Sequence, residues 1–373
     1  MKGSIKKNKK TGKWDFVIDI GKDSLTGNRK QKKRRGFKTR KEAERALNTL
    51  LHELNEGTFI EPSKQTYGKY LDTWMSSKRH DLSLQTYKLY TSYISSHINP
   101  ILGKLKLSDL NTYHIQHFVN ELRGKGLSDS TVKRIFNVVN TSLNNAKKLE
   151  MIKKNPANNL EKPKVNTKDI AIWDHDEISL FLKTAKKSPY YIVFLLSITT
   201  GMRQGELLGL RFKDVDFENK CLYIRQTLNH DGSGFKEGAK SKAGYRSVGV
   251  DSTTLSALEI QRVNNNTNKL KHAGEYEDYD LVACTKKGRS INPRNLIRTF
   301  YNLTSKANLP KIRFHDLRHT HASLMLQQGE NVKIISERLG HSSVKVTLDI
   351  YSHVLPNMQN EASDRFAQKL FNT

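Results

Sequence analysis

The chain has 373 residues, enough for two or three domains, and its 64 Lys and Arg against 37 Asp and Glu give a formal net charge of +27. Such an excess of positive charge destabilises a compact fold unless a polyanion offsets it, so nucleic acid is the first candidate partner and an anionic membrane surface the second. Two distant cysteines exclude a disulfide framework, the charged N-terminus lacks the apolar core of a signal peptide, and no apolar run is long enough for a membrane span. Composition therefore predicts a cytoplasmic protein.

The first part of the chain, residues 1–60, is the most basic, with 17 Lys and Arg against 7 Asp and Glu. Residues 13–20 alternate apolar and polar side chains, which predicts a strand, and residues 30–37 are a second candidate strand. A small sheet with cations on its open face can enter the major groove of DNA. The candidate DNA-binding residues are therefore Lys30, Lys32, Lys33, Arg34 and Arg35.

A helix is predicted to follow this sheet, between residues 39 and 57. Thr39 and Glu42 form a capping-box pair at its start, apolar residues recur at helical spacing, and Gly57 ends it. The alternative for this part of the chain is a basic disordered arm, against which the periodic helix argues. We therefore expect a domain over residues 1–60 made of a small sheet and one helix.

Residues 65–160 are predicted to form an all-helical domain, because four segments have helical periodicity and none has the alternation of a strand. Lys and Arg occupy outward positions in these segments, which suits contacts with phosphate groups. Prolines, asparagines and charges then predict a linker over residues 161–172. The last helical segment has an apolar stripe of Val132, Ile135, Phe136, Val139, Leu143 and Ala146.

The remaining part, residues 173–373, mixes helices with a short antiparallel sheet. Asp174 and Glu177 are a capping pair ahead of an apolar helix. The fold class predicted for the whole chain is multidomain α+β, with a sheet-and-helix domain, a helical domain and a mainly helical third domain. The strand candidates of the third domain are residues 221–228 and 245–250, and its helix candidates include residues 292–307 and 319–329.

The segment FHDLRHTHASLML, residues 314–326, contains three histidines and one arginine. His315 and His319 have the spacing of two zinc ligands on a helix, but the zinc-protease pattern has Glu directly after the first histidine, where this chain has Asp316. No downstream residues complete a metal-binding motif, and the two cysteines offer no ligand pair. We therefore favour phosphate binding over metal binding, and we expect neither a metal nor a cofactor.

A phosphoryl-transfer site needs cations that stabilise charge on the nonbridging oxygens, and arginine offers paired planar donors for them. Arg203 follows Thr-Gly at the end of an apolar helix, and Arg318 lies one helical turn after His315, on the same face. Further candidates in chain order are Lys242 at a predicted hairpin turn, His341 after a glycine, and Tyr351 near the C-terminus.

Each candidate also has a structural interpretation. Arg203 is one helical turn from Glu206 and could simply pair with it, and His315 could be a satisfied core histidine. Tyr351 is one of 14 tyrosines. The prediction rests on the ordered set of residues rather than on any single member.

This set, with Arg in TGMRQGELLGL, Lys on a β-turn, HDLRHT, LGH and a late Tyr, resembles the tyrosine recombinases, the integrases of phages and conjugative transposons. The resemblance covers the whole chain. It implies an arm-binding domain with a three-stranded sheet and a helix, a helical core-binding domain and a catalytic domain. No catalytic position departs from the family pattern, which has His or Trp where His341 stands.

The resemblance implies that Tyr351 attacks the scissile phosphate and forms a 3′-phosphotyrosine with a free 5′-hydroxyl. Arg203 and Arg318 would hold the nonbridging oxygens, and His341 would donate a further hydrogen bond. Lys242 would protonate the leaving 5′-oxygen. His315 is the acid–base candidate at the tyrosine, Glu206 and Asp316 are expected to support these groups, and His319 and His321 are expected to be structural.

Because four strands are cut and each chain has one such tyrosine, we expect a homotetramer on paired core-type and arm-type DNA sites. The resemblance further implies an excisionase and a host DNA-bending protein as partners, and a bacterial or phage-encoded enzyme associated with the nucleoid. The last segment has a helical apolar pattern, which predicts packing on a neighbouring protomer or on its own domain, through Ala362, Phe366, Leu370 and Phe371.

The function predicted from the sequence is integration and excision of a mobile genetic element through a Holliday junction. One alternative is DNA relaxation by a monomer of the type IB topoisomerase kind, and another is an intramolecular resolvase, whose chains lack the first 60 residues. A third is a DNA-binding regulator with an idle site. The basic sheet domain favours an integrase, and the complete catalytic set argues against an idle site.

Overall fold

The computed structural model describes residues 3–22, 27–57, 59, 63–161, 163, 171–237, 245–351, 363, 366–368 and 370–371. The chain divides into a first unit, Met1–Thr167, and a second unit, Lys168–Thr373. Within the described ranges, no helix combines the length and apolar composition needed to cross a lipid bilayer.

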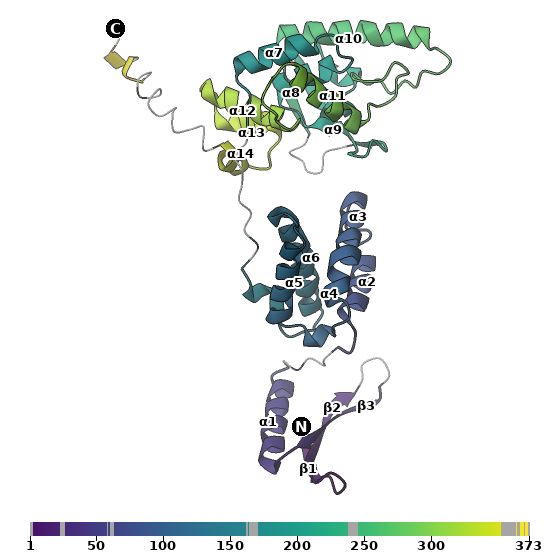
Figure 1. The fold of residues 1–373 in the computed structure, drawn as a ribbon, viewed down its shortest axis with the longest axis vertical. Coiled ribbons are helices and arrows are strands. Elements are labelled where there is room, and N and C mark those ends of the chain that lie inside the picture. The colour runs from purple at the N-terminus through teal and green to yellow at the C-terminus, as the bar shows by residue number, and fades with distance from the viewer. Residues whose placement is uncertain are drawn as a thin grey trace. The chain divides into compact units, whose positions relative to one another are not determined.

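The first unit begins with a three-stranded antiparallel sheet, in the order β1 (Gly3–Lys7), β2 (Trp14–Lys22) and β3 (Arg29–Phe37). Helix α1 (Arg40–Asn55) packs on one face of this sheet, and the capping box predicted at its start is present (Figure 1). The predicted sheet backed by one helix is confirmed. The apolar core between the two layers consists of Phe16, Ile18, Leu47 and Leu50.

The pairing of β2 with β3 divides the cations of β3 between the two faces of the sheet. Lys32 lies opposite the buried Ile18, and so on the face that α1 covers, with its Nζ 4.6 Å from the ring centre of Phe59. Arg34 lies opposite another buried residue of β2 and shares this face. Lys33 points to the open face, because side chains alternate along a strand. The predicted DNA-binding cations are therefore not all on the open face.

The rest of the first unit is helical, as predicted. The buried face of the last long helix contains the whole apolar stripe predicted from the sequence, and the side chains of the neighbouring helices complete a separate core around it. The linker predicted over residues 161–172 lies largely outside the described residues. The longer helices are α2 (Tyr67–Ser77), α3 (Leu84–Tyr93), α5 (Thr112–Gly124) and α6 (Asp129–Lys148).

The second unit is mainly helical with two small antiparallel sheets, which confirms the predicted fold class. One sheet has the order β4 (Val215–Asp216), β5 (Cys221–Ile224) and β8 (Arg246–Gly249), and the other pairs β6 (Gln226–Leu228) with β7 (Phe235–Glu237). The helices are α7 (His175–Ala185), α8 (Tyr191–Thr200), α9 (Gln204–Gly209), α10 (Ser252–Lys271), α11 (Pro293–Lys306), α12 (Asp316–Gln327), α13 (Val332–Leu339) and α14 (Val344–Tyr351).

Helix α8 lies at the centre of the second unit and is apolar around its circumference, as a fully buried helix requires. It packs against α7, α10 and α12. The end of α8 therefore lies beside α12, which brings the segment around Arg203 close to the segment around Arg318. An aromatic cluster fixes this packing: Trp173, Phe181, Phe194, Phe300 and Phe314.

Candidate active site

The site starts at Gly201, which ends α8 in the left-handed conformation with φ of 64°. A Cβ atom at this position would lie 2.6 Å from Cδ2 of His321, so both the backbone conformation and the available space require glycine. The turn exposes the carbonyl of Gly201 to Arg318, whose Nη1 donates to it at 2.7 Å. It also places Arg203 at the N-cap of α9.

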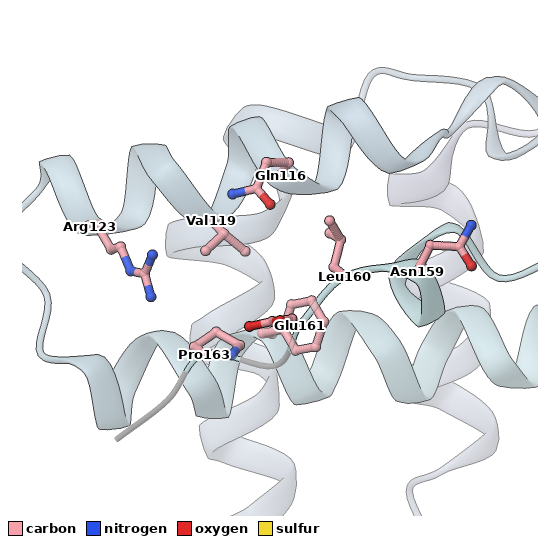
Figure 2. Close-up of a pocket in the computed structure, with 8 residues that line it drawn as sticks. Gln116, Val119, Arg123, Asn159, Leu160, Glu161 and Pro163 are labelled. Atoms are coloured by element: carbon pink, nitrogen blue, oxygen red, sulfur yellow. The ribbon is translucent and has the colours of Figure 1, made fainter. Parts of the chain in front are cut away.

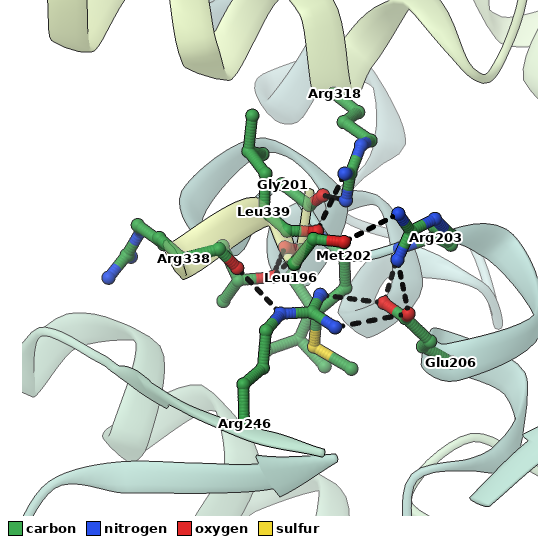
Figure 3. Close-up of polar contacts among 11 residues, drawn as sticks. Leu196, Gly201, Met202, Arg203, Glu206, Arg246, Arg318, Arg338 and Leu339 are labelled. Atoms are coloured by element: carbon green, nitrogen blue, oxygen red, sulfur yellow. Dashed lines mark hydrogen bonds and ion pairs between the residues drawn. The ribbon is translucent and has the colours of Figure 1, made fainter. Parts of the chain in front are cut away.

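A second left-handed glycine, Gly340, ends α13 with φ of 66°. The carbonyl of Leu339 accepts a hydrogen bond from Nη2 of Arg318 at 2.6 Å, and the carbonyl of Gly340 accepts one from Nη2 of Arg203 at 3.0 Å. Figure 3 shows these contacts converging between the two arginines. One short turn thus orients Arg203 and Arg318, which we call the arginine pair.

Glu206 is the carboxylate that supports the arginine pair. Its Oε1 accepts from Nη1 of Arg203 at 2.9 Å, and its two oxygens accept from Nη1 and Nη2 of Arg246 at 3.1 and 2.8 Å. Burial of this carboxyl acts to raise its pKa, but the hydrogen bonds and charge of Arg246 outweigh burial and hold the pKa of Glu206 below its usual value. Glu206 is therefore ionised at neutral pH.

Arg318 is only 3% exposed. Burial, and secondarily the nearby charge of Arg203, lowers the pKa of Arg318 to about 9. The guanidinium contacts described for it are to the backbone carbonyls of Gly201 and Leu339, which carry no full negative charge. The arginine pair therefore retains positive charge that an anion such as a phosphate group would neutralise.

Tyr351, the last residue of α14, is buried against α12 and α13. Its hydroxyl oxygen lies 2.8 Å from Nδ1 of His319. Burial raises the pKa of Tyr351 to about 12, although the charge of Arg318 acts in the opposite direction. Burial also lowers the pKa of His319 to about 4, with His315 adding to the effect. At neutral pH, both the phenol and the imidazole are uncharged.

His315 lies one turn before His319, and the two rings meet edge to face with centroids 5.2 Å apart. Burial, followed by the charge of Arg318, lowers the pKa of His315. The adjacent Asp316 is 4% exposed and forms hydrogen bonds with the guanidinium and backbone N–H of Arg313, so it fixes the turn that begins α12. The histidine in contact with the Tyr351 hydroxyl is thus His319, which the sequence pattern had assigned to a structural role.

His341 follows the glycine turn at the end of α13, as predicted from LGH. Its Nδ1 lies 2.8 Å from Oγ1 of Thr347, which orients the ring. Burial lowers the pKa of His341 to about 4, with Arg318 as the next cause, so the imidazole is neutral at pH 7. Lys242 lies outside the described residues.

Two residues of this arrangement, His319 and Arg246, were not among the predicted site residues. His319 shares a helix face with His315, and this i, i+4 relationship was visible in the sequence. Arg246 gave no sequence signal beyond its place four residues after Lys242. His321, which is buried, bonds the Ile198 carbonyl through Nδ1 and accepts from Nε of Arg338, which agrees with its expected structural role.

A separate cavity of about 390 Å³ lies in the first unit, between residues of α5 and α6 and the residues 159–161 and 163 (Figure 2). Its lining contains no histidine, tyrosine or cysteine, and the candidate catalytic residues that are described all belong to the second unit. We therefore do not assign it to the reaction. The lining residues are Gln116, Val119, Arg123, Phe136, Asn159, Leu160, Glu161 and Pro163.

Three family models match successive parts of the chain. The arm DNA-binding domain matches residues 4–54, the N-terminal SAM-like domain of phage integrases matches residues 66–123, and the phage integrase family matches residues 172–358. The chain is 29% identical to a tyrosine recombinase XerC-like protein of Caldanaerobacter subterraneus subsp. tengcongensis, over 95% of this chain and 96% of that protein. It is 26% identical to the ICEBs1 integrase of Bacillus subtilis, over 97% and 98% respectively.

Solved structures share the fold. The Tn1549 transposon integrase in complex with a circular intermediate DNA aligns with a TM-score of 0.69 at 19% identity, covering 82% of this chain and 100% of that one. A lambda integrase tetramer bound to a Holliday junction aligns with a TM-score of 0.58 at 16% identity, covering 93% and 94%. The chain belongs to the phage integrase family. It is a site-specific recombinase of the tyrosine type, an enzyme, as the sequence predicted.

Proposed function

We propose that this recombinase cuts DNA by attack of Tyr351 on the scissile phosphate. The Tyr351 oxygen forms a bond to phosphorus, the bond from phosphorus to the 5′-oxygen breaks, and a 3′-phosphotyrosine results. The arginine pair holds the nonbridging oxygens, where charge develops in the transition state. The reverse reaction, with a 5′-hydroxyl from a second duplex, rejoins the strands without any external energy source.

Two groups would move the protons. The hydroxyl of Tyr351 loses its proton to Nδ1 of His319, the neutral acceptor 2.8 Å away. Lys242 gives a proton to the departing 5′-oxygen. His341 donates from Nε2 to a nonbridging oxygen, in the tautomer whose Nδ1 accepts a hydrogen bond from the Thr347 hydroxyl. His315, beside His319 and under the influence of Arg318, remains the second acid–base candidate at the tyrosine.

The observation that carries this proposal is the joint placement of Tyr351 and the arginine pair. The turn at Leu339 and Gly340 holds both arginines, and Leu339 also lies in the apolar cluster that buries Tyr351. A tyrosine in this position with an adjacent proton acceptor can act as a nucleophile on an anion that the arginines bind.

The rest of the chain would supply DNA binding and assembly. The net charge of +27 and the match of residues 4–54 to an arm DNA-binding domain support binding of the first domain to arm-type sites. Residues 65–160 would bind core-type sites. A homotetramer on paired sites would integrate and excise a mobile element in the bacterial cytoplasm, at the nucleoid, with an excisionase and a host DNA-bending protein as partners.

The test uses nicked suicide duplexes taken from the DNA that flanks the protein's own gene, incubated in EDTA and run on a denaturing gel. The wild-type protein should form a covalent band that Tyr351→Phe abolishes. A band that persists in Tyr351→Phe would assign the nucleophile elsewhere. Tight noncovalent binding without any covalent band from any flanking duplex would count against strand cleavage.

A further inference from the structure

Arg246 connects the two supports of the arginine pair. It is the first residue of β8, and its side chain is 7% exposed. Through Nη1 and Nη2 it donates to both oxygens of Glu206 at 3.1 and 2.8 Å, and through Nε it donates to the carbonyl of Arg338 at 2.7 Å. Figure 3 shows Arg246 between these two acceptors, opposite the arginine pair.

Each acceptor leads directly to the arginine pair. Glu206 accepts the hydrogen bond of Arg203. The carbonyl of Arg338 immediately precedes those of Leu339 and Gly340, which hold Arg318 and Arg203. One buried guanidinium therefore fixes both the carboxylate beside Arg203 and the turn shared by the two arginines.

The second support is itself anchored. Arg338 donates to the carbonyls of Thr199 at 2.8 Å and Gly249 at 2.9 Å, so the end of α13 is tied to α8 and to β8. Arg246 joins the same strand, β8, to Glu206 in α9. Displacement of β8 would thus move both supports of the arginine pair together.

We propose that Arg246 is a positioning residue for the arginine pair, acting through Glu206 and the turn at residues 338–340 without contacting DNA. This inference rests on the proposed function. Three donors of the Arg246 guanidinium are used inside the protein, and their directions match the planar fork of arginine. A lysine ammonium at the same place cannot reach the three acceptor oxygens in this geometry.

Two modified duplexes separate this role from an effect on the leaving group. A methylphosphonate at the scissile position replaces one nonbridging oxygen by a neutral methyl group, so it depends less on the arginine pair. A sulfur atom in place of the bridging 5′-oxygen makes the leaving group a thiolate. Because a thiol is a much stronger acid than an alcohol, the thiolate can leave without a proton from Lys242. The wild-type protein, Arg246→Met and Lys242→Ala are compared on both duplexes and on the normal one.

Arg246→Met should slow covalent-complex formation on the normal duplex on the order of 10- to 100-fold, with little change in noncovalent DNA affinity. On the methylphosphonate duplex, the ratio of the wild-type rate to the Arg246→Met rate should be smaller. On the sulfur duplex, this ratio should be the same as on the normal duplex. For Lys242→Ala, the rate should recover on the sulfur duplex, and the defect on the methylphosphonate duplex should be as large as on the normal one. Recovery of Arg246→Met on the sulfur duplex, or a rate within about twofold of wild type on the normal one, would overturn the proposal.

Arg225→Met is the matched control. Arg225 directly follows β5, the strand that pairs with β8, and it forms an ion pair with Asp214 while its side chain is 54% exposed. It should cleave all three duplexes at the wild-type rate. Arg246→Lys keeps the charge and should fold, yet it should retain most of the cleavage defect of Arg246→Met.

A double-mutant cycle gives a readout that does not depend on cleavage. The denaturation midpoints of Arg246→Met, Glu206→Gln and the double variant should be non-additive. The double variant should be more stable than Arg246→Met alone, because Arg246→Met leaves the buried Glu206 carboxylate with only the half-exposed Arg203 as its charged partner, whereas the double variant removes that charge. Additive midpoints would refute the coupling between these residues. If wild-type protein forms no covalent complex, the proposed function fails, and the cycle still decides whether Arg246 and Glu206 are coupled.

Discussion

The hydroxyl oxygen of Tyr351 lies 2.8 Å from Nδ1 of His319, and both side chains are neutral at pH 7 because burial moves their pKa values away from neutrality, to about 12 and about 4. With the imidazole proton on Nε2, the phenol donates to Nδ1. The tyrosine is thus poised to lose its proton to a partner that is already in contact, rather than to ionise in advance.

The first prediction concerns His319 and His315. His319→Ala should slow cleavage by about 10²-fold, because general-base assistance is lost. Its remaining activity should rise by about tenfold per pH unit between pH 7 and 9, as the tyrosinate fraction grows, whereas the wild-type rate should be nearly constant there. The measurement is the single-turnover rate of covalent-complex formation. A steeper pH dependence in His315→Ala than in His319→Ala would return the acid–base role to His315.

The second prediction concerns stability at low pH. Burial lowers the pKa values of His319 and His341 to about 4 and that of His321 to about 3, from an ordinary value of 6.5. Below pH 6.5 the unfolded chain therefore binds more protons than the folded chain, so the stability present above pH 6.5 is lost as the pH falls toward 4.

Thermal unfolding of the full chain between pH 7 and 4.5 measures this effect. The melting temperature should decline continuously below pH 6.5, and His321→Gln should show a shallower decline, because one of the three groups is removed. A melting temperature that stays constant from pH 7 to 5 would contradict the assignment of these histidines as neutral in the folded state.

The third prediction concerns Gly201. Gly201→Ala introduces a Cβ 2.6 Å from His321 at a φ of 64°, so it should destabilise the protein by about 1–3 kcal/mol and displace the carbonyl that holds Arg318. Gly274→Ala is the control, because its Cβ meets no atom within 4 Å. Chemical denaturation and cleavage rates report both effects. Equal stability for the two variants would mean that the turn tolerates a side chain.

The fourth prediction concerns DNA binding by β3. Lys33 points to the open face of the sheet, whereas Lys32 lies on the α1 side with its ammonium over Phe59. Lys33→Ala should therefore weaken binding to arm-type DNA and reduce the salt dependence of binding by about one counterion. Lys32→Ala should change the salt dependence less. Titration of labelled duplexes at several salt concentrations distinguishes them, and identical slopes would show that both lysines reach the DNA.

Sequence patterns captured the architecture because each element has a strong local signal. The capping boxes at Thr39 and Asp174 fixed two helix starts, and the apolar stripe of α6 fixed a buried face. Strands β5, β6 and β8 lie within the predicted segments. The residues of Gly3–Lys7 alone do not predict strand β1, because they have little apolar alternation and form a strand by pairing with β2; only the family resemblance implied a third strand in this sheet.

The site was predictable only in part, since contacts between distant segments decide it. The sequence placed Arg203 and Arg318 in recognisable motifs, but it did not reveal that carbonyls of one turn hold both. Nor did it reveal which histidine of the cluster meets Tyr351, because the position of α14 against α12 settles that choice. Arg246 acquires its role through tertiary contacts alone.

The reliance of Arg203 and Arg318 on main-chain oxygens has a consequence for how this enzyme can change. Carbonyl acceptors at residues 201, 339 and 340 belong to the shape of the backbone and not to any side chain. Directed evolution toward new DNA targets can therefore alter many side chains around the site while the geometry of the arginine pair persists, provided that the two left-handed glycine turns are kept. Among the active variants of such a library, substitutions at Gly201 and Gly340 should consequently be less frequent than substitutions at the neighbouring positions.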